Sequence, residues 1–153
     1  MNLLTLDNPV FETYALVAAL MVLKIMRQGW MTVYRMLKSD SGLVSPEDLQ
    51  KGLINKSPRP DQLEVNDYVD RSRRMHRNDL ENIPAFLAIG LIFVAVDPTL
   101  LAAQVLMFGF ALARLAHAVA YFTKQTHEVR ATFYSIGSLI VIFMAVYVLW
   151  NVI

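Results

Sequence analysis

Apolar residues gather in four stretches of the chain, separated by shorter polar segments. A helix crosses a bilayer with ~20 mostly apolar residues, each of which adds ~1.5 Å to its length. The stretches at about 100–122 and 129–153 satisfy that length directly. The stretch at about 10–26 satisfies it if the helix continues through RQGWMTVY and leaves the membrane.

The remaining stretch, at about 83–96, is too short alone but can end a longer helix. A helix that begins near Asn66 or Asp67 would measure ~45 Å, with its first turns at or above the lipid headgroups. Pro84 lies inside it, removes one backbone hydrogen bond and should bend it. The pattern thus predicts helices at about 10–37, 66–96, 99–122 and 128–152, in a single integral-membrane domain of residues 1–153.

A soluble four-helix bundle is the rival fold. Such a bundle should show polar side chains at every turn of each helix. The segment YSIGSLIVIFMAVYVLWNVI has almost none. The chain is also 56% hydrophobic and 18% charged, which exceeds the apolar share of ordinary soluble domains. We therefore predict an all-α fold, a four-transmembrane-helix bundle.

Basic residues collect in two of the three connections between these helices. Lys51, Lys56 and Arg59 lie in the loop at about 38–65, and Lys124 lies just before the last helix. The positive-inside rule places both connections in the cytosol and both termini on the other side. The first residues lack the basic region of a cleaved signal peptide, so none is expected. The net charge of +1 gives no nucleic-acid footprint, and no nucleic-acid partner is expected.

The loop at about 38–65 contains the segment SPED. Ser45 can cap a short helix, Pro46 suits its first position, and Asp48 completes a capping box. The segment NKSPRPD that follows is predicted to be an irregular turn.

The chain has no cysteine, which excludes disulfides, thiolate metal sites and a thiol nucleophile supplied by the protein. His76, His117 and His127 are widely spaced and form no metal-ligand pattern. No metal site is expected.

A polar stripe leads into the apolar stretch at 83–96. At ~100° per residue, four side chains fall within roughly 100° of one another: Arg74, Arg77, Asn78 and Glu81. Arg73, His76 and Asp79 lie off this stripe, toward another helix or water. The conservative interpretation is an ion pair of Arg77 with Glu81, worth a few tenths of a kcal/mol. Stability alone would not require so many donors, so the set favours a function.

The last two helices repeat this theme. Arg114, His117 and Tyr121 have spacing i, i+3, i+7 and share one side of a helix, near its cytosolic end. Arg130 and Tyr134 share a face of the next helix. The conservative interpretations are pairing of Arg114 with an acidic neighbour or snorkelling, a satisfied core histidine, an interfacial tyrosine and an interfacial arginine.

Arg35 extends the first helix into the same layer. Such a ring of side chains suits a small, polar, anionic ligand from the cytosol, with carboxylates for the arginines and an amine for Glu81. A carboxylate at that depth needs a partner, because an unpaired charge in hydrocarbon is costly. A second, apolar partner would arrive through the lipid.

The segments DRSRRMHRNDLENIPAFLAIGL, ARLAHAVAY and SPED resemble the signatures of the MAPEG family, the membrane-associated proteins of eicosanoid and glutathione metabolism. The resemblance covers nearly the whole chain. It implies a homotrimer in the endoplasmic reticulum or the mitochondrial outer membrane, with glutathione bound between subunits on the cytosolic side. The implied glutathione-binding residues are Arg35, Arg73, Arg74, His76, Arg77, Asn78, Glu81, His117, Tyr121 and Tyr134.

The resemblance also implies a mechanism in which Arg130 is the catalytic residue. A free thiol has a pKa of ~8.5, and a nearby guanidinium favours the thiolate. Arg130 matches the arginine that would do this for bound glutathione. The thiolate would then attack an electrophilic carbon of a hydrophobic substrate or reduce a lipid hydroperoxide.

The branches of the family differ in a few positions. The prostaglandin E synthase branch has a serine where Ala131 stands, which favours the microsomal glutathione transferase branch of the first type. Tyr134 and Asp48 are shared with the synthase branch, so an endoperoxide isomerase that forms prostaglandin E is the alternative. A non-enzymatic lipid-binding adaptor is a second alternative, against which the retained arginines argue.

Overall fold

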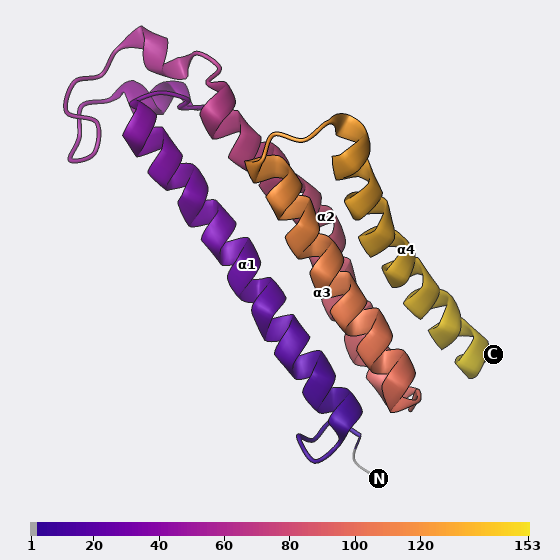
Figure 1. The fold of residues 1–153 in the computed structure, drawn as a ribbon. Coiled ribbons are helices and arrows are strands. Elements are labelled where there is room, and N and C mark those ends of the chain that lie inside the picture. Colours follow the sequence, from indigo (N-terminus) through magenta and orange to yellow (C-terminus); the bar gives the residue numbers. More distant parts are fainter. Residues whose placement is uncertain (1–2) are drawn as a thin grey trace. The chain divides into compact units, whose positions relative to one another are not determined.

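The computed structural model describes residues 3–153, and these residues form helices and loops without strands. The long helices in this range are α1 (Pro9–Ser39), α2 (Asp67–Ala95), α3 (Leu100–Phe122) and α4 (His127–Val152) (Figure 1). All four are long and apolar enough to cross a membrane. The prediction of an all-α fold with four transmembrane helices is confirmed, and the chain is an integral membrane protein.

The helix ends lie one or two residues from the predicted ends, except at Phe122 and Val152, which agree. The Thr99 hydroxyl accepts a hydrogen bond from the Ala102 N–H at 3.3 Å, so α3 begins directly after Thr99. Helix α2 continues through Pro84 without a break.

The loop between α1 and α2 contains two short 3₁₀ helices, η1 (Pro46–Leu49) and η2 (Pro60–Leu63). In η1, the Asp48 carboxylate accepts a hydrogen bond from the Ser45 N–H at 3.2 Å, as the SPED segment predicts. The prediction of an irregular turn through NKSPRPD is wrong at its end, where η2 begins. Proline fixes φ near the helical value, so Pro60 favours the first position of a helical turn.

The contacts of the chain gather in two compact units. Unit 1 comprises Met1–Ile25 and Asn78–Ile153, and unit 2 comprises Met26–Arg77. Helices α1 and α2 each contribute residues to both units. The single domain of residues 1–153 stays a prediction.

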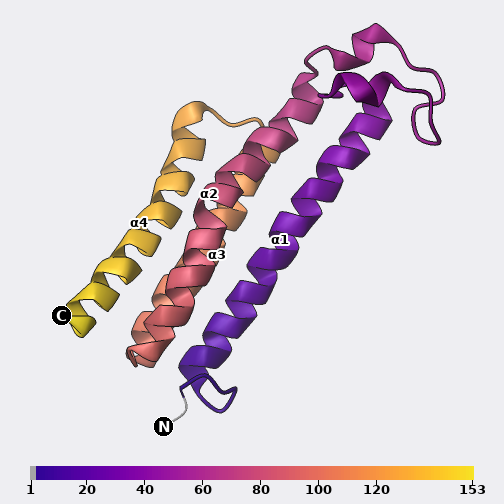
Figure 2. The ribbon, with the colours of Figure 1, turned by 180° about the vertical axis from the view of Figure 1, so that it is seen from behind.

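Aromatic side chains form the centre of unit 1. Phe86 of α2 and Phe110 of α3 stack with ring centroids 4.2 Å apart, and these parts of α2 and α3 run side by side (Figure 2). The Tyr14 hydroxyl of α1 donates to the Leu87 carbonyl at 2.8 Å. A Cβ at Gly90 would lie 2.9 Å from the Tyr14 ring, so this approach of α1 to α2 requires glycine. Large apolar side chains also point outward from all four helices, as expected for surfaces in lipid.

Gln62 organises the loop of unit 2. Its buried side chain accepts hydrogen bonds from Asn55 Nδ2 at 2.8 Å and from the Arg59 N–H at 3.1 Å. It also donates to Asp40 Oδ1 at 2.8 Å. The hydrogen bonds from Arg59 and Gln62 hold the pKa of the Asp40 carboxyl below its usual range. Gln62 therefore ties both parts of the loop to the end of α1.

We predict that Gln62→Leu loosens this loop. Loss of a buried hydrogen-bonding side chain leaves its partners unsatisfied, at a cost of ~1–3 kcal/mol. Trypsin should then cleave after Lys51 or Lys56 several times faster than in the wild type. Gln50→Leu, at an exposed position in the same loop, is the matched control. Equal cleavage rates in the two variants would show that Gln62 does not hold the loop.

Candidate functional site

A buried carboxylate, Asp79, joins three helices of unit 1. Its side chain has 0% exposure and accepts hydrogen bonds from Lys24 of α1 and from Arg114 of α3. The Arg114 Nε lies 2.8 Å from Asp79 Oδ1. The carboxylate compensates both positive charges, which are costly to bury among apolar helices. Of the two positions predicted for Asp79, another helix or water, the structure shows the first.

Lys24 is the member of this group that sequence reasoning missed. It appears in the sequence as a charge that interrupts an apolar stretch, and that interruption was the available signal. For Arg114, pairing with an acidic neighbour is confirmed. Its side chain is fully buried, which excludes snorkelling.

Arg114 also fixes the protonation of His117. Its Nη2 lies 2.9 Å from His117 Nδ1, and both side chains are buried. A guanidinium can only donate, so Nδ1 must accept. The His117 ring is therefore neutral and carries its proton on Nε2. This makes His117 a hydrogen-bond donor at the nitrogen opposite Arg114.

Tyr121 connects the neighbouring helices beside His117. The edge of one ring meets the other, with centroids 5.0 Å apart. The Tyr121 hydroxyl accepts a hydrogen bond from Asn78 Nδ2 of α2 at 2.9 Å. The Arg130 guanidinium of α4 lies 4.8 Å from the centre of the Tyr121 ring, a cation–π distance. The first turn of α4 is thus held against α3.

Glu81 and Tyr134 complete the arrangement. The Tyr134 hydroxyl donates to Glu81 Oε2 at 3.0 Å. The Tyr134 ring centre also lies 6.3 Å from that of His117 and 5.7 Å from the Arg114 guanidinium. Six of the predicted site residues are therefore connected within unit 1, and we call this set the unit 1 cluster: Asn78, Glu81, His117, Tyr121, Arg130 and Tyr134.

The other predicted site residues belong to unit 2, where three arginines have partners. Arg35 is buried, donates to the Tyr68 carbonyl at 2.9 Å and lies over the Tyr68 ring. Arg73 donates to the Gly42 carbonyl. Arg74 binds Asp67 at 2.7 Å and Asp70 at 3.1 Å. Here each arginine stabilises the start of α2 or its contact with α1 and the loop.

His76 and Arg77 differ from these arginines. Arg77 is exposed. The His76 Nε2 is buried, and no group in residues 3–153 hydrogen-bonds to it. Arg77 is thus the accessible one of the two, and His76 keeps a buried nitrogen without a hydrogen bond in the described chain.

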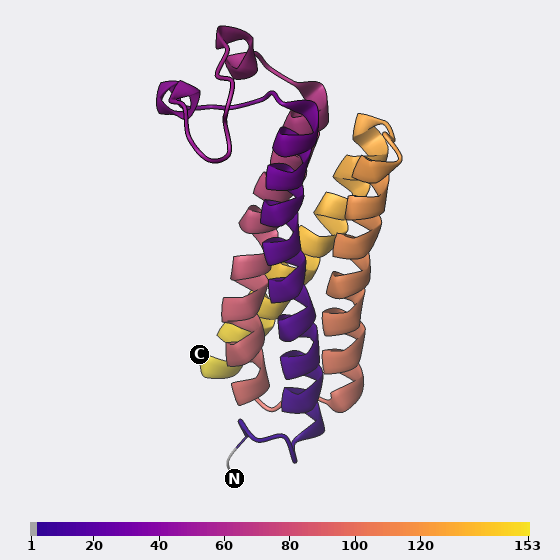
Figure 3. The ribbon, with the colours of Figure 1, turned by 90° about the vertical axis from the view of Figure 1, so that its left-hand side faces the viewer.

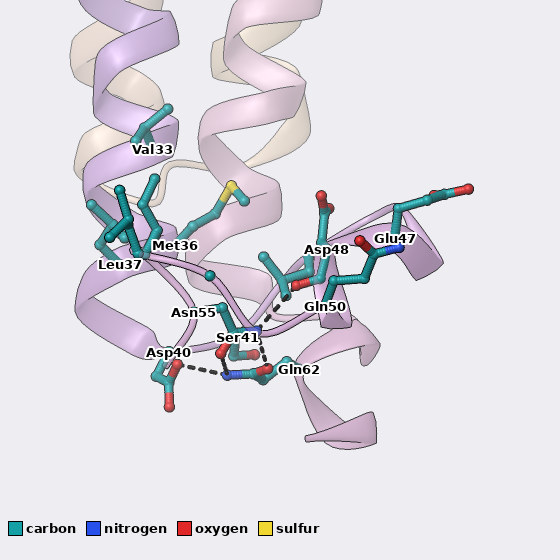
Figure 4. A pocket seen from close by; sticks show the side chains of 14 residues that line it. Val33, Met36, Leu37, Asp40, Ser41, Glu47, Asp48, Gln50, Asn55 and Gln62 are labelled. Atoms are coloured by element: carbon teal, nitrogen blue, oxygen red, sulfur yellow. Dashed lines mark hydrogen bonds between the residues drawn. The ribbon is translucent and has the colours of Figure 1, made fainter. Parts of the chain in front are cut away.

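Unit 2 also contains a pocket of about 600 Å³ between the end of α1 and the loop (Figure 4). Asp40, Glu47 and Asp48 stand at it among apolar side chains, and its lining includes no lysine, arginine or histidine. The predicted glutathione-binding residues are absent from this lining. The pocket therefore differs in chemistry from the unit 1 cluster.

The unit 1 cluster offers complementary charges within one small region. Arg130 supplies a cation, Glu81 an anion, and His117 a neutral donor. Two tyrosine hydroxyls lie between them. Such a set suits a small ligand that carries both carboxylate and amine groups.

The chain is similar in sequence to known proteins over most of its length. The MAPEG family model matches residues 14–150. Microsomal glutathione S-transferase 1 of Bos taurus is 33% identical over 141 residues, which is 92% of this chain and 89% of that protein. Prostaglandin E synthase of Bos taurus is 30% identical over 148 residues, or 95% of this chain and 92% of that protein. Microsomal glutathione S-transferase 1 of Homo sapiens is 33% identical over 143 residues, with 92% and 89% coverage.

We predict that Asp79→Asn destabilises the protein far more than Lys24→Met. Asp79→Asn removes the anion that pairs with both Lys24 and Arg114, whereas Lys24→Met keeps the pair of Asp79 with Arg114. Removal of one partner from a buried pair costs ~3–5 kcal/mol. Thermal unfolding in lipid nanodiscs measures the difference. A Lys24→Met variant as unstable as Asp79→Asn would contradict this charge balance.

We also predict that nitrogen NMR of ¹⁵N-histidine-labelled protein shows one ring with bare Nδ1 and protonated Nε2 at neutral pH. The His117→Gln variant assigns that signal by its disappearance. In Arg114→Leu, the ring should lose its single tautomer, since the donor to Nδ1 is gone. A wild-type ring that is protonated on Nδ1 would refute the deduction from the Arg114 contact.

Proposed function

This chain belongs to the MAPEG family, and we propose that it is a membrane-bound glutathione transferase and peroxidase. It joins the thiolate of glutathione to hydrophobic electrophiles and reduces lipid hydroperoxides. The observation that carries this proposal is the convergence of Arg130, His117 and Glu81 around two tyrosines in unit 1. The similarity to the microsomal glutathione S-transferase 1 relatives, over about nine tenths of the chain, supports it.

Glutathione has two carboxylates, one amine and one thiol, and the unit 1 cluster has groups that suit the amine, the peptide oxygens and the thiol. Glu81 takes the amine, with the Tyr134 hydroxyl already on one carboxylate oxygen. His117 Nε2 and Asn78 donate to oxygens of the peptide. Arg73, Arg74 and Arg77, with Arg35 and His76, are the proposed partners of the carboxylates.

Arg73 and Arg74 can serve ligand carboxylates only if they exchange partners. Asp67 and Asp70 occupy Arg74 at present, and Asp70 also lies 3.6 Å from Arg73. These contacts are partly exposed and therefore contribute little to stability. A ligand carboxylate would replace one surface ion pair with another at small cost. The homotrimer, with the site between subunits and open to the cytosol, belongs to the same proposal.

Arg130 is the proposed catalytic residue. Its Nε donates to the Thr126 carbonyl at 3.3 Å and its guanidinium lies on the Tyr121 ring, and neither contact neutralises its charge. A thiolate bound there would supply the missing negative charge. The guanidinium would lower the thiol pKa from ~8.5, and each unit corresponds to ~1.36 kcal/mol in favour of the thiolate.

The residue after Arg130 favours the transferase over the synthase. Ala131 has no hydroxyl to offer near the sulfur, so this position supplies no proton donor for an isomerase. The alternative is a glutathione-dependent prostaglandin E synthase, an endoperoxide isomerase. The prostaglandin E synthase relatives and the contact of Tyr134 with Glu81 favour this alternative. A lipid-binding adaptor would have no use for the cluster.

We predict that Arg130→Leu lowers kcat for conjugation of a halogenated dinitrobenzene ~100-fold, since loss of one group that stabilises the reacting charge commonly has that effect. Glutathione affinity should fall much less. The thiolate absorbance of the bound glutathione should disappear at neutral pH. Lys124→Leu removes an exposed cation from the same connection and is the control. Unchanged turnover in Arg130→Leu would remove Arg130 from the mechanism.

The two enzymatic readings separate by their products. We expect the protein in lipid nanodiscs to conjugate glutathione to the halide and to reduce a fatty-acid hydroperoxide. With a prostaglandin endoperoxide, we expect no enrichment of the E-type product over the buffer control. Efficient E-type formation would instead establish the alternative, and absence of all glutathione-dependent turnover would favour the adaptor.

A further inference from the structure

A tight turn in unit 2 presents two large aliphatic side chains to the surroundings. The Gly52 N–H donates to the Asn55 carbonyl at 2.9 Å and closes the turn. Leu53 and Ile54 lie between them, with 95% and 81% of their surfaces exposed. Turns are usually built from Gly, Pro, Asn, Asp and Ser, whose backbone angles or side-chain hydrogen bonds favour the turn. An adjacent leucine and isoleucine at this point therefore need an apolar environment.

The turn is held in place by its own hydrogen bonds. Asn55 donates to the Asp48 carbonyl at 3.1 Å and to Gln62 Oε1 at 2.8 Å. Gln62 is buried and binds the end of α1 through Asp40. These hydrogen bonds hold the turn against the end of α1 in a conformation that exposes Leu53 and Ile54.

The turn folds back along α1. Leu53 and Ile54 line the same pocket as Val33 and Leu37, which lie in the last two turns of α1 (Figure 4). The tip of the loop accordingly lies beside the last turns of α1 and does not extend beyond the helix end (Figures 1 and 3). The four side chains form one apolar surface.

This part of α1 has the features of a membrane interface. Trp30 is 71% exposed and lies one turn before Val33, and tryptophan is enriched where lipid meets water. The helix has 31 residues, a length of ~46 Å, which matches a bilayer with its headgroups. Its last turns therefore stand among the headgroups, and the turn returns toward the acyl chains.

The charged residues of segment 49–60 are all cations, and the carboxylates that line the pocket, Asp40, Glu47 and Asp48, lie outside this segment. Lys51 and Lys56 flank the aliphatic pair and are exposed. No aspartate or glutamate occurs between Asp48 and Asp61 in the sequence. Apolar side chains with flanking lysines characterise segments that lie in the interface of anionic membranes.

We propose that the Gly52–Asn55 turn is an interfacial anchor that inserts Leu53 and Ile54 between phospholipids of the bilayer that the helices cross. Lys51 and Lys56 bind the lipid phosphates. The pocket beside α1 then holds lipid acyl carbons. This role is independent of the proposed glutathione chemistry, since the turn contains none of the predicted site residues.

The absence of cysteine in the chain permits a direct test with single spin labels. Ile54→Cys is labelled with a nitroxide in nanodiscs of phosphatidylcholine and phosphatidylserine, and Ser57→Cys, an exposed position in the same loop, is the control. We expect the Ile54 label to collide with oxygen several times more often than with a water-soluble nickel complex. The Ser57 label should show the reverse.

Two results would overturn the proposal. Equal nickel accessibility at both positions would show that the turn stays in water. Spin–spin coupling between labels, lost on dilution with unlabelled protein, would show that a second copy of the chain covers the turn.

Charge reversal identifies the lipid group that the lysines bind. The double variant Lys51→Glu and Lys56→Glu should raise nickel accessibility at Ile54 several-fold in anionic nanodiscs, and much less in pure phosphatidylcholine. An equal rise in both lipids would exclude recognition of anionic headgroups. Thermal unfolding confirms that the variant is folded, as expected for substitutions at exposed positions.

Discussion

The buried carboxylate of Asp79 is the polar group at which α1, α2 and α3 meet within unit 1. It lies among apolar helices and binds a cation from α1 and another from α3. In hydrocarbon an ion has no water to return to, so each of these charges is costly unless the others are in place. Nonpolar packing alone leaves helices free to slide, whereas this contact sets the depth of α1, α2 and α3 relative to one another at one level.

The contacts of Asp79 also influence the candidate site, because each side chain between them orients the next one. Asp79 orients Arg114, and Arg114 determines which nitrogen of His117 carries the proton. His117 lies against Tyr121, on which the Arg130 guanidinium rests. The buried ion pair thus orients the groups that are proposed to bind the ligand. A preorganised donor set costs little reorganisation when a ligand binds, which is the usual source of electrostatic catalysis.

Much of this fold could be predicted because membrane-spanning helices are recognised in a sequence by their length and apolar composition. The polar face of α2 followed from 100° spacing, and the Asn78 and Glu81 side chains do meet partners from α3 and α4. Which side chains pair with one another inside the helix bundle could not be predicted. Lys24 and Asp79 are 55 positions apart, and nothing in the sequence says that they share a depth.

Arginines in the polar segment show the same limit. The family resemblance implied that Arg73 and Arg74 bind glutathione, although spacing put only Arg74 on the polar stripe. The structure gives both of them protein partners. A guanidinium has five N–H donors, so one arginine can bind a protein group and a ligand at the same time. The sequence does not tell which of these partners each arginine has. The exposure of Leu53 and Ile54 could not be predicted either. The sequence of a loop with hydrophobic residues does not tell whether their side chains pack inward or point outward.

The decisive measurement is a structure of the protein in a lipid nanodisc with glutathione bound. We predict that the peptide contacts Glu81, His117 and Tyr121 with its sulfur beside Arg130, while Asp79 keeps both cations and touches no ligand atom. A sulfur remote from Arg130, or an Asp79 carboxylate turned from Arg114 toward the ligand, would contradict it.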